Sequence, residues 1–188
     1  MDKQQSALLV MDMQVPLLQR LPDGGTALAG RVAAAIRSAR EREIPVIFVR
    51  LGFRKGMPEV SPENKMFSSL KSSIGDEGLD AFMQIHPQLG MLETDLLIDK
   101  KRISAFSGND LEMILRAQNI RHLVLTGIAT SGIVLSTQRE AFDKDFAVTI
   151  LADCCADSDA ATHEFLITKL LPRLATVSTL EAWATDTM

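Results

Sequence analysis

Hydrophobic residues alternate along the chain between short runs rich in β-branched residues and longer stretches in which apolar positions recur every three or four residues. The short runs are typical of buried strands, and the longer spacing is typical of helices with one buried face. We therefore predict strands at residues 6–12, 45–51, 94–99, 121–127, 146–151 and 174–178. We predict helices between the first two strands and at about residues 109–118, 130–143 and 158–171.

Strands and helices that alternate in this way build repeated βα units around a parallel sheet. Right-handed crossovers favour a doubly wound sheet with helices on both faces, and 3-2-1-4-5-6 is the commonest order for six such strands. We predict a three-layer, Rossmann-like α/β fold with a six-stranded parallel sheet in that order. The length of 188 residues fits a single domain over residues 1–188.

Residues 52–75 interrupt the alternation. This segment contains turn formers such as Gly56, Pro58 and Pro62, together with charged residues and two phenylalanines, without a clear period. Compact domains seldom keep so long a loop without a use. We therefore interpret the segment as a substrate lid rather than as a linker.

The composition is that of an ordinary globular protein. Hydrophobic residues make up 46% of the chain and charged residues 23%, and the net charge is −4. Lys and Arg are dispersed, so the chain has no electrostatic footprint for nucleic acid or for an anionic membrane. The first apolar stretch, residues 7–11, is too short for a signal sequence or a membrane span, so we expect a cytoplasmic protein.

The two cysteines, Cys154 and Cys155, are neighbours in the chain. Neighbouring thiols cannot form a disulfide framework or supply a four-ligand zinc site, so they indicate a reducing compartment. They follow the fifth predicted strand and could reach a cleft, although buried structural cysteine is the commoner case. His86, His122 and His163 are scattered singly, which is more often structural than ligating, and we predict no metal or other cofactor.

Two charged residues lie where the chemistry of such a sheet is expected, at the carboxyl ends of strands. Asp12 ends the first apolar run, where an ionised carboxylate is costly unless it is paired or lies in a polar cleft. It is either a cap for the next turn or a functional group. Lys100 ends the third strand, where a basic cluster is usually a solvated rim, but the apolar residues at 105–106 favour one cation turned inward.

Small residues join the fourth strand to the helix that follows it. Ile128, Ala129 and Thr130 would let a substrate approach the backbone, and the helix N-terminus would offer N–H groups to a negatively charged oxygen. A tight strand-to-helix turn also needs small residues, for steric reasons alone. Both interpretations stay open on the residues themselves.

Taken together, these segments resemble the isochorismatase-like hydrolases, also called the cysteine hydrolase superfamily. The segments that carry the resemblance, in chain order, lie at residues 8–14, 44–50, 86–87, 100–106, 126–130 and 151–153, with His163 beyond them. The family pattern implies an active-site triad of Asp, Lys and Cys. Asp12 and Lys100 match the first two positions, whereas Ile133 occupies the position of the nucleophilic cysteine.

Isoleucine at position 133 bears directly on the reaction that the resemblance implies. Amidases of the family, which include nicotinamidases and carbamoyl hydrolases, form a covalent acyl-enzyme through a thiolate, and isoleucine cannot do so. A cysteine-dependent amidohydrolase is therefore disfavoured. True isochorismatases instead cleave a vinyl ether to an alcohol and pyruvate, with the Asp as general acid.

By the same resemblance, Asp12 and Lys100 are the catalytic residues of a hydrolase that acts on a small, anionic molecule without a cysteine nucleophile. Lys100 would orient Asp12 and hold a substrate carboxylate, while Gln14, Arg50 and Phe106 would line the pocket. A neighbouring ammonium lowers a carboxyl pKa, so burial would have to outweigh it for Asp12 to act as an acid near neutral pH.

A non-catalytic binding or assembly protein that retained the fold is the alternative. Family members commonly form dimers or tetramers, so the resemblance also implies a homodimer or homotetramer, with a small-molecule substrate as the other partner.

Overall fold

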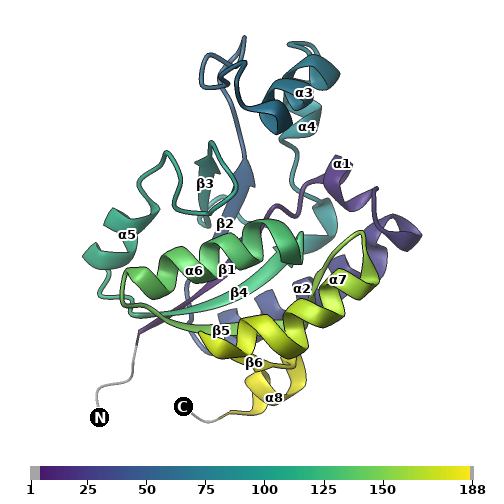
Figure 1. Ribbon diagram of the computed structural model, residues 1–188. Helices are drawn as coiled ribbons and strands as arrows, with labels where there is room; N and C mark the ends of the chain where they lie inside the picture. The colour runs from purple at the N-terminus through teal and green to yellow at the C-terminus, as the bar shows by residue number, and fades with distance from the viewer. Residues whose placement is uncertain (1–4, 187–188) are drawn as a thin grey trace.

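The computed structural model describes residues 5–186, in which six parallel strands form one sheet with helices on both faces (Figure 1). The strands are β1 (Ser6–Met11), β2 (Val46–Leu51), β3 (Leu96–Lys100), β4 (His122–Ile128), β5 (Ala147–Ala156) and β6 (Thr176–Ser178). Their order in the sheet is β3-β2-β1-β4-β5-β6, and every neighbouring pair is parallel. The predicted fold class and strand order are confirmed.

The α-helices are α1 (Val15–Leu18), α2 (Thr26–Glu41), α3 (Lys65–Ile74), α4 (Leu79–Phe82), α5 (Leu111–Ala117), α6 (Leu135–Asp143), α7 (Ala160–Phe165) and α8 (Leu180–Thr185). Short 3-10 turns lie at Pro22–Gly25, Pro87–Leu89 and Leu171–Arg173, and π-helical turns at Thr130–Val134 and Leu166–Leu170. The helices predicted from periodicity correspond to α2, to α5, to α6 with the π-turn before it, and to α7 with the π-turn after it. Asp159 caps α7, because its side chain accepts a hydrogen bond from the backbone of Ala161.

The core lies in two layers, one on each face of the sheet. On β1, Leu9 contributes to the layer under α5, α6 and the π-turn Leu166–Leu170, and Val10 to the layer under α2 and α8. Successive strand residues point to opposite faces, and every residue of β1 is buried because helices cover both. This double coverage explains the unbroken apolar run at residues 7–11.

The fifth strand is longer than predicted and includes both cysteines. β5 continues to Ala156, so Cys154 and Cys155 lie within the strand rather than beyond its end. Cys155 packs into the layer under α6 and Cys154 into the layer under α2. Burial raises the pKa of both thiols, that of Cys154 to about 12, so both stay protonated and serve as small core residues.

The segment at residues 52–75 is not the irregular loop that the sequence predicted, because its second half is the helix α3. Asn64 caps this helix by accepting a hydrogen bond from the backbone of Phe67. With α4 it forms a small module, residues 52–82, that has an apolar cluster of its own around Phe53, Met57 and Phe67. Figure 1 shows α3 and α4 standing together apart from the sheet. Serines between the apolar positions of α3 obscure its period in the sequence.

Candidate active site

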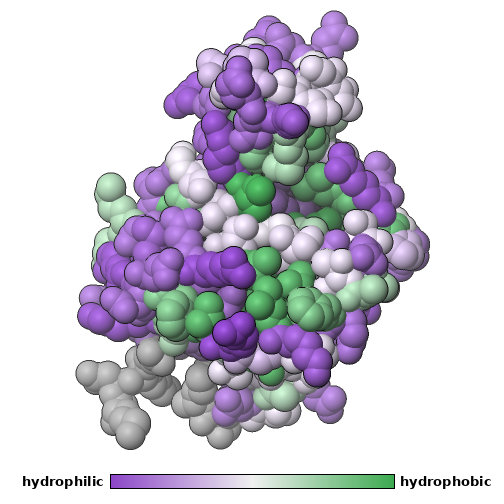
Figure 2. Space-filling model, viewed as in Figure 1, coloured by the Kyte–Doolittle hydropathy of each residue, from purple (hydrophilic) through white to green (hydrophobic). Residues whose placement is uncertain are grey.

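A cavity of about 530 Å³ lies at the carboxyl ends of β1, β3 and β4, beneath the module that carries α3 and α4. Figure 2 shows the surface hollowed beneath this module. Its walls come from the ends of the strands, from α1 and the turn after it, from α3, and from the start of the π-turn that precedes α6. A volume of this size is ordinary for a site that holds a small molecule.

Asp12 lies at the base of this cavity, directly after β1. Its backbone N–H donates to the carbonyl of Val49 on β2 at 2.8 Å, so the pairing of β1 continues through it. Its φ of 54° falls in the left-handed region, which residues other than glycine seldom adopt. Such conformations persist where surrounding structure imposes them, and they concentrate at functional sites.

Lys100 reaches Asp12 from two strands away. It ends β3 and lies opposite Leu51 of β2, which separates β3 from β1 in the sheet. Adjacent strands are roughly 4.8 Å apart, so a side chain must bridge roughly 10 Å here, and the long stem of a lysine can do so. The Lys100 Nζ lies 2.9 Å from Asp12 Oδ2 and donates to the carbonyl of Arg102 at 2.9 Å, and the side chain is only 2% exposed.

Burial and the ammonium of Lys100 have opposite effects on the pKa of Asp12. Burial is the larger effect and raises the pKa of Asp12, whereas the charge of Lys100 and its hydrogen bond lower that pKa. The balance leaves the pKa of Asp12 at about 6, above the ordinary value of 3.8. While Oδ2 is paired with Lys100, Asp12 Oδ1 is buried without a hydrogen-bond partner among residues 5–186. The carboxyl group therefore keeps one oxygen unpaired at a residue that lines the cavity.

An aliphatic wall completes this end of the cavity. Ile133, in the π-turn before α6, is 1% exposed and lines the cavity together with Ile128 and Ala129. Gly127 makes the close approach of β4 to β1 possible, because a Cβ there would lie 1.9 Å from the carbonyl oxygen of Met11. The correspondence of Ile133 to the family's cysteine and the oxyanion role of Ile128 and Ala129 stay predictions.

Two predicted pocket residues near β2 do not line the cavity. Arg50 lies opposite Asp99 and pairs with it at 2.6 Å. Because strand side chains alternate, this places Arg50 on the face of β2 opposite the one shared by Leu51 and Lys100. Gln14 is buried and clamps the backbone: its amide oxygen accepts from the N–H of Leu51, and its amide nitrogen donates to the carbonyl of Phe82.

Phe106 and Thr130 also lie outside the cavity lining. Phe106 belongs to the core, where its ring stacks on Phe146 with the ring centroids 5.9 Å apart. Thr130 is fully buried, and its hydroxyl lies 2.8 Å from Nδ1 of His163, which joins the π-turn to α7. Both residues belong to the structure around the cavity, and neither forms part of its lining.

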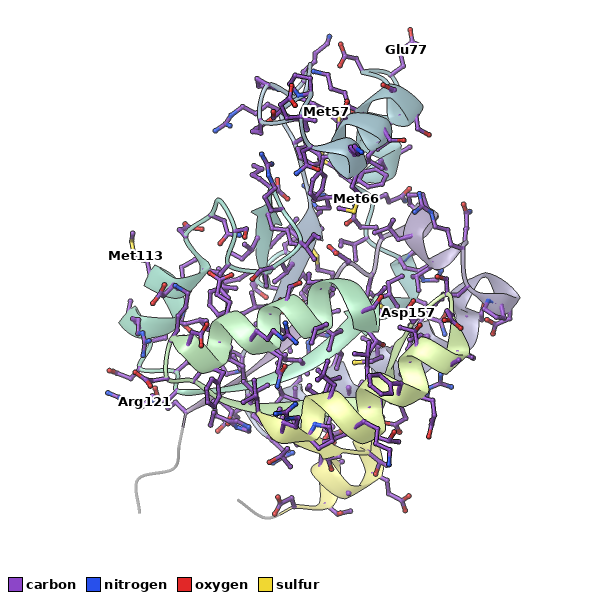
Figure 3. All side chains as sticks on the ribbon, viewed as in Figure 1. Met57, Met66, Glu77, Met113, Arg121 and Asp157 are labelled. Carbon is purple, nitrogen blue, oxygen red and sulfur yellow. The ribbon has the colours of Figure 1, made fainter. Side chains whose placement is uncertain are left out.

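Other residues of the lining were missed from the sequence. Arg20 and two leucines come from α1 and the turn after it, and α3 contributes Met66, Ser69, Leu70 and Ser73. Figure 3 shows Met66 on the side of α3 that faces the body of the molecule. The apolar residues that follow Asn64 at helical spacing were the signal available in the sequence. Arg20 carries no local signal, because nothing nearby in the chain distinguishes it from a solvated arginine.

Among residues 5–186, no three His, Cys, Asp or Glu side chains are grouped so that they could hold a metal ion. The helices of the same residues include none long and apolar enough to cross a membrane.

Comparison with known proteins places the chain beside many relatives. The isochorismatase domain family matches residues 6–182. The chain is 32% identical over 181 residues to the isochorismatase family protein YecD of Escherichia coli O157:H7, covering 94% of this chain and 93% of that protein. It is 31% identical over 191 residues to the ureidoacrylate amidohydrolase RutB of Stutzerimonas stutzeri, covering 87% and 72% of the two chains.

Solved structures show the same fold. An isochorismatase family protein from Burkholderia thailandensis superposes with a TM-score of 0.77 at 28% identity, covering 95% of this chain and 93% of that one. One from Desulfovibrio vulgaris reaches a TM-score of 0.84 at 21% identity, covering 96% and 97%. With a match over nearly its whole length and relatives above 30% identity, the chain belongs to the isochorismatase family.

Proposed function

We propose that this protein is a hydrolase in which Asp12 acts as a general acid, held by Lys100, on a small anionic substrate of the vinyl-ether type. The observation that carries the proposal is the state of the Asp12 carboxyl group. It is buried, its pKa is raised to about 6, and its Oδ1 is unpaired among the described residues. A carboxyl group of this kind can carry a proton near neutral pH and release it to a bound substrate.

The hydrogen bonds of Asp12 decide which oxygen carries the proton. Oδ2 faces the ammonium of Lys100 at 2.9 Å, so a proton is favoured on Oδ1 instead. Transfer of that proton to the methylene carbon of a vinyl ether leaves an oxocarbenium ion, which water captures. The adduct then breaks its carbon–oxygen bond, which releases an alcohol and a ketone. Lys100 stabilises the carboxylate left on Asp12 until a proton returns.

The route without a covalent intermediate follows from the side chains around Asp12. Ile133 has no atom that can attack a carbonyl group, and it fills the wall beside the acid. Both cysteines are buried, with raised thiol pKa values, and lie outside the cavity lining. A thiolate nucleophile would therefore require a different residue at this wall.

An amide is the second candidate substrate, because several relatives at about 31% identity are named ureidoacrylate amidohydrolases. The aliphatic wall disfavours the thioester route for it. The substrate panel therefore contains both classes: isochorismate and simple enol ethers, and ureido and carboxamide compounds.

The test is a steady-state assay of this panel with wild-type protein, Asp12→Asn and a matched control, Asp110→Asn. Asp110 precedes α5 and its side chain makes no capping hydrogen bond, so its replacement should change nothing. We expect Asp12→Asn to lower kcat/KM for the enol ether by about 10²- to 10⁴-fold, as loss of a general acid does. Unchanged activity in Asp12→Asn, or turnover of amides alone, would reject the mechanism.

Asparagine tolerates the left-handed conformation of position 12, so the backbone can be kept. The substitution leaves Lys100 buried without its carboxylate, and circular dichroism must show that the variant is folded. If it is not folded, the double substitution Asp12→Asn with Lys100→Met removes the unpaired ammonium and repeats the test.

The pH profile checks the same acid independently. A general acid works only while it is protonated, and the pKa of Asp12 is about 6. We therefore expect kcat/KM to be highest below pH 6 and to fall about tenfold per pH unit above it. A rate that rises through this range would show that position 12 acts as a base, contrary to the proposal.

A further inference from the structure

Three charged side chains line the cavity, and two of them neutralise each other. Asp12 and Lys100 form the buried pair at its base, and Arg20 is the third. Among residues 5–186, Arg20 makes no ion pair and its guanidinium makes no hydrogen bond. Every N–H of a guanidinium is a hydrogen-bond donor. The cavity therefore holds one cation without a protein partner.

Lys100 is badly placed to hold the negative group of a substrate. Its side chain is 2% exposed, and its ammonium already contacts Asp12 Oδ2 and the carbonyl of Arg102. Its position at the base of the cavity suits a role in orienting Asp12 and stabilising its carboxylate. The sequence led us to expect that Lys100 would hold a substrate carboxylate, and its existing contacts argue against that part of its role.

Arg20 lies on the wall formed by α1 and the turn after it, between Leu17 and Leu21. Residues 12–21 thus supply both the acid at the base and the free cation on the wall. Arg20 is exposed, and the two leucines make an apolar surface beside it, next to which its guanidinium can form charge-assisted hydrogen bonds with a ligand.

The wall that α3 contributes carries hydroxyl groups between apolar side chains. Met66, Ser69, Leu70 and Ser73 are spaced by three and four residues, so they share one face of the helix, and all four line the cavity. The hydroxyls of Ser69 and Ser73 make no hydrogen bond with the described part of the chain. This face can pack against the apolar body of a ligand. Its two serine hydroxyls can also accept a hydrogen bond from that ligand or donate one to it.

We propose that Arg20 is the specificity-determining residue of the cavity and that it binds a carboxylate of the substrate. The substrate class is a small monocarboxylate whose short, mainly apolar body lies between the Leu17–Leu21 wall and α3, with its reacting group at Asp12. A planar guanidinium matches the two oxygens of a carboxylate. While Asp12 is ionised and paired with Lys100, Arg20 is left to balance a single negative charge. The substrate class deepens the proposed function and rests on it, whereas the binding site for a carboxylate can be tested without turnover.

The test measures binding rather than turnover, by calorimetric titration with hydrocinnamate and with its neutral amide, hydrocinnamamide. The variants are Arg20→Gln, Arg20→Lys and the matched control Arg121→Gln, which Figure 3 places at the far end of the molecule from α3. We expect wild-type protein to bind the carboxylate about tenfold more tightly than the amide, as a charge-assisted pair predicts. Arg20→Gln should abolish this preference without weakening the amide, Arg20→Lys should restore part of it, and Arg121→Gln should leave it unchanged.

A preference for the carboxylate that survives in Arg20→Gln overturns the proposal, as does an absence of carboxylate binding in wild-type protein. Titration with inorganic phosphate separates the sources of the negative charge: tighter binding of phosphate than of hydrocinnamate, lost in Arg20→Gln, also overturns the assignment to carboxylates. Asp12→Asn should retain the binding preference. If binding depends on Arg20 while Asp12→Asn keeps full activity, the carboxylate site stands and the proposed mechanism fails.

Discussion

At the scale of single residues, the site depends on a carboxyl group that burial and an ammonium affect in opposite directions. Burial raises the pKa of Asp12 more than Lys100 lowers it, and the result is about 6. The type and place of both residues were readable in the sequence, because each ends a strand. The resulting pKa of Asp12 could not be read from the sequence, because it depends on how completely helices and the α3–α4 module exclude water from the pair.

The wall at Ile133 gives a residue-scale prediction. A thiol introduced by Ile133→Cys would line the cavity near Asp12, whereas Val134→Cys, the matched control, would be buried outside the lining. We expect iodoacetamide to inactivate Ile133→Cys and to leave Val134→Cys and wild-type protein active, since only the first thiol would lie on the cavity wall, within reach of the reagent. We also expect Ile133→Cys to gain hydrolysis of ureido amides.

Mass spectrometry of the alkylated protein and an amide assay provide the measurements. Equal alkylation of the two variants would contradict the position assigned to Ile133. Selective alkylation without amide hydrolysis would show that the wall is correctly placed but that the remainder of an amidase site is absent.

At the scale of elements, the module of residues 52–82 covers the cavity and is tied to the sheet next to the site. Arg102 is one tie: its carbonyl accepts from Lys100, and its guanidinium donates to the carbonyl of Glu59 at 2.9 Å and lies over the ring of Phe67. The sequence indicated a lid here but missed α3, because the serines on its surface hide the apolar period. Packing of α3 into the apolar cluster of the module stabilises this helix instead.

Arg102→Gln should loosen this module. The substitution removes the cation over Phe67 and weakens the hydrogen bond to Glu59. We expect amide hydrogen exchange in α3 to increase by about tenfold, which corresponds to about 1.4 kcal/mol of local stability, with no change in α2. Arg139→Gln on the exposed face of α6 is the control. Unchanged exchange in α3 would contradict this role of Arg102.

At the scale of the whole molecule, two layers of helices leave apolar side chains on the surface. Figure 2 shows hydrophobic residues gathered where α6 and α7 lie next to each other. Phe165 of α7 is 57% exposed. A contiguous apolar patch, rather than a single exposed residue, is typical of a surface that associates with another protein. We therefore expect this face to take part in the dimer or tetramer that the family resemblance implies.

Light scattering tests the association. We expect wild-type protein to have the mass of a dimer or tetramer, and Phe165→Asp to shift the mass toward the monomer, because a buried interface cannot accommodate an unpaired carboxylate. Met113→Asp is the matched control: Met113 is 73% exposed on α5, away from this face (Figure 3). A monomeric wild-type protein, or an unchanged mass in Phe165→Asp, would contradict the prediction.

The sequence by itself determined where the strands and the longest helices lie, and it led to the commonest strand order for such a sheet. The apolar run at residues 7–11 requires a strand buried on both faces, and alternation with helical periods leads to a doubly wound parallel sheet. It also placed Asp12 and Lys100 at strand ends, because the end of an apolar run is visible in a linear chain. These properties are local, because the spacing of apolar side chains along the chain determines whether a segment forms a strand or a helix.

Only the tertiary structure decided which side chains meet. The register of β3 on β2 sends Lys100 across to Asp12 and turns Arg50 to the other face, where it pairs with Asp99. Folding of the module over the sheet brings α3 opposite Arg20 across one cavity. Contacts of this kind depend on register, strand order and side-chain direction over long separations, and the spacing of residues along the chain does not specify them.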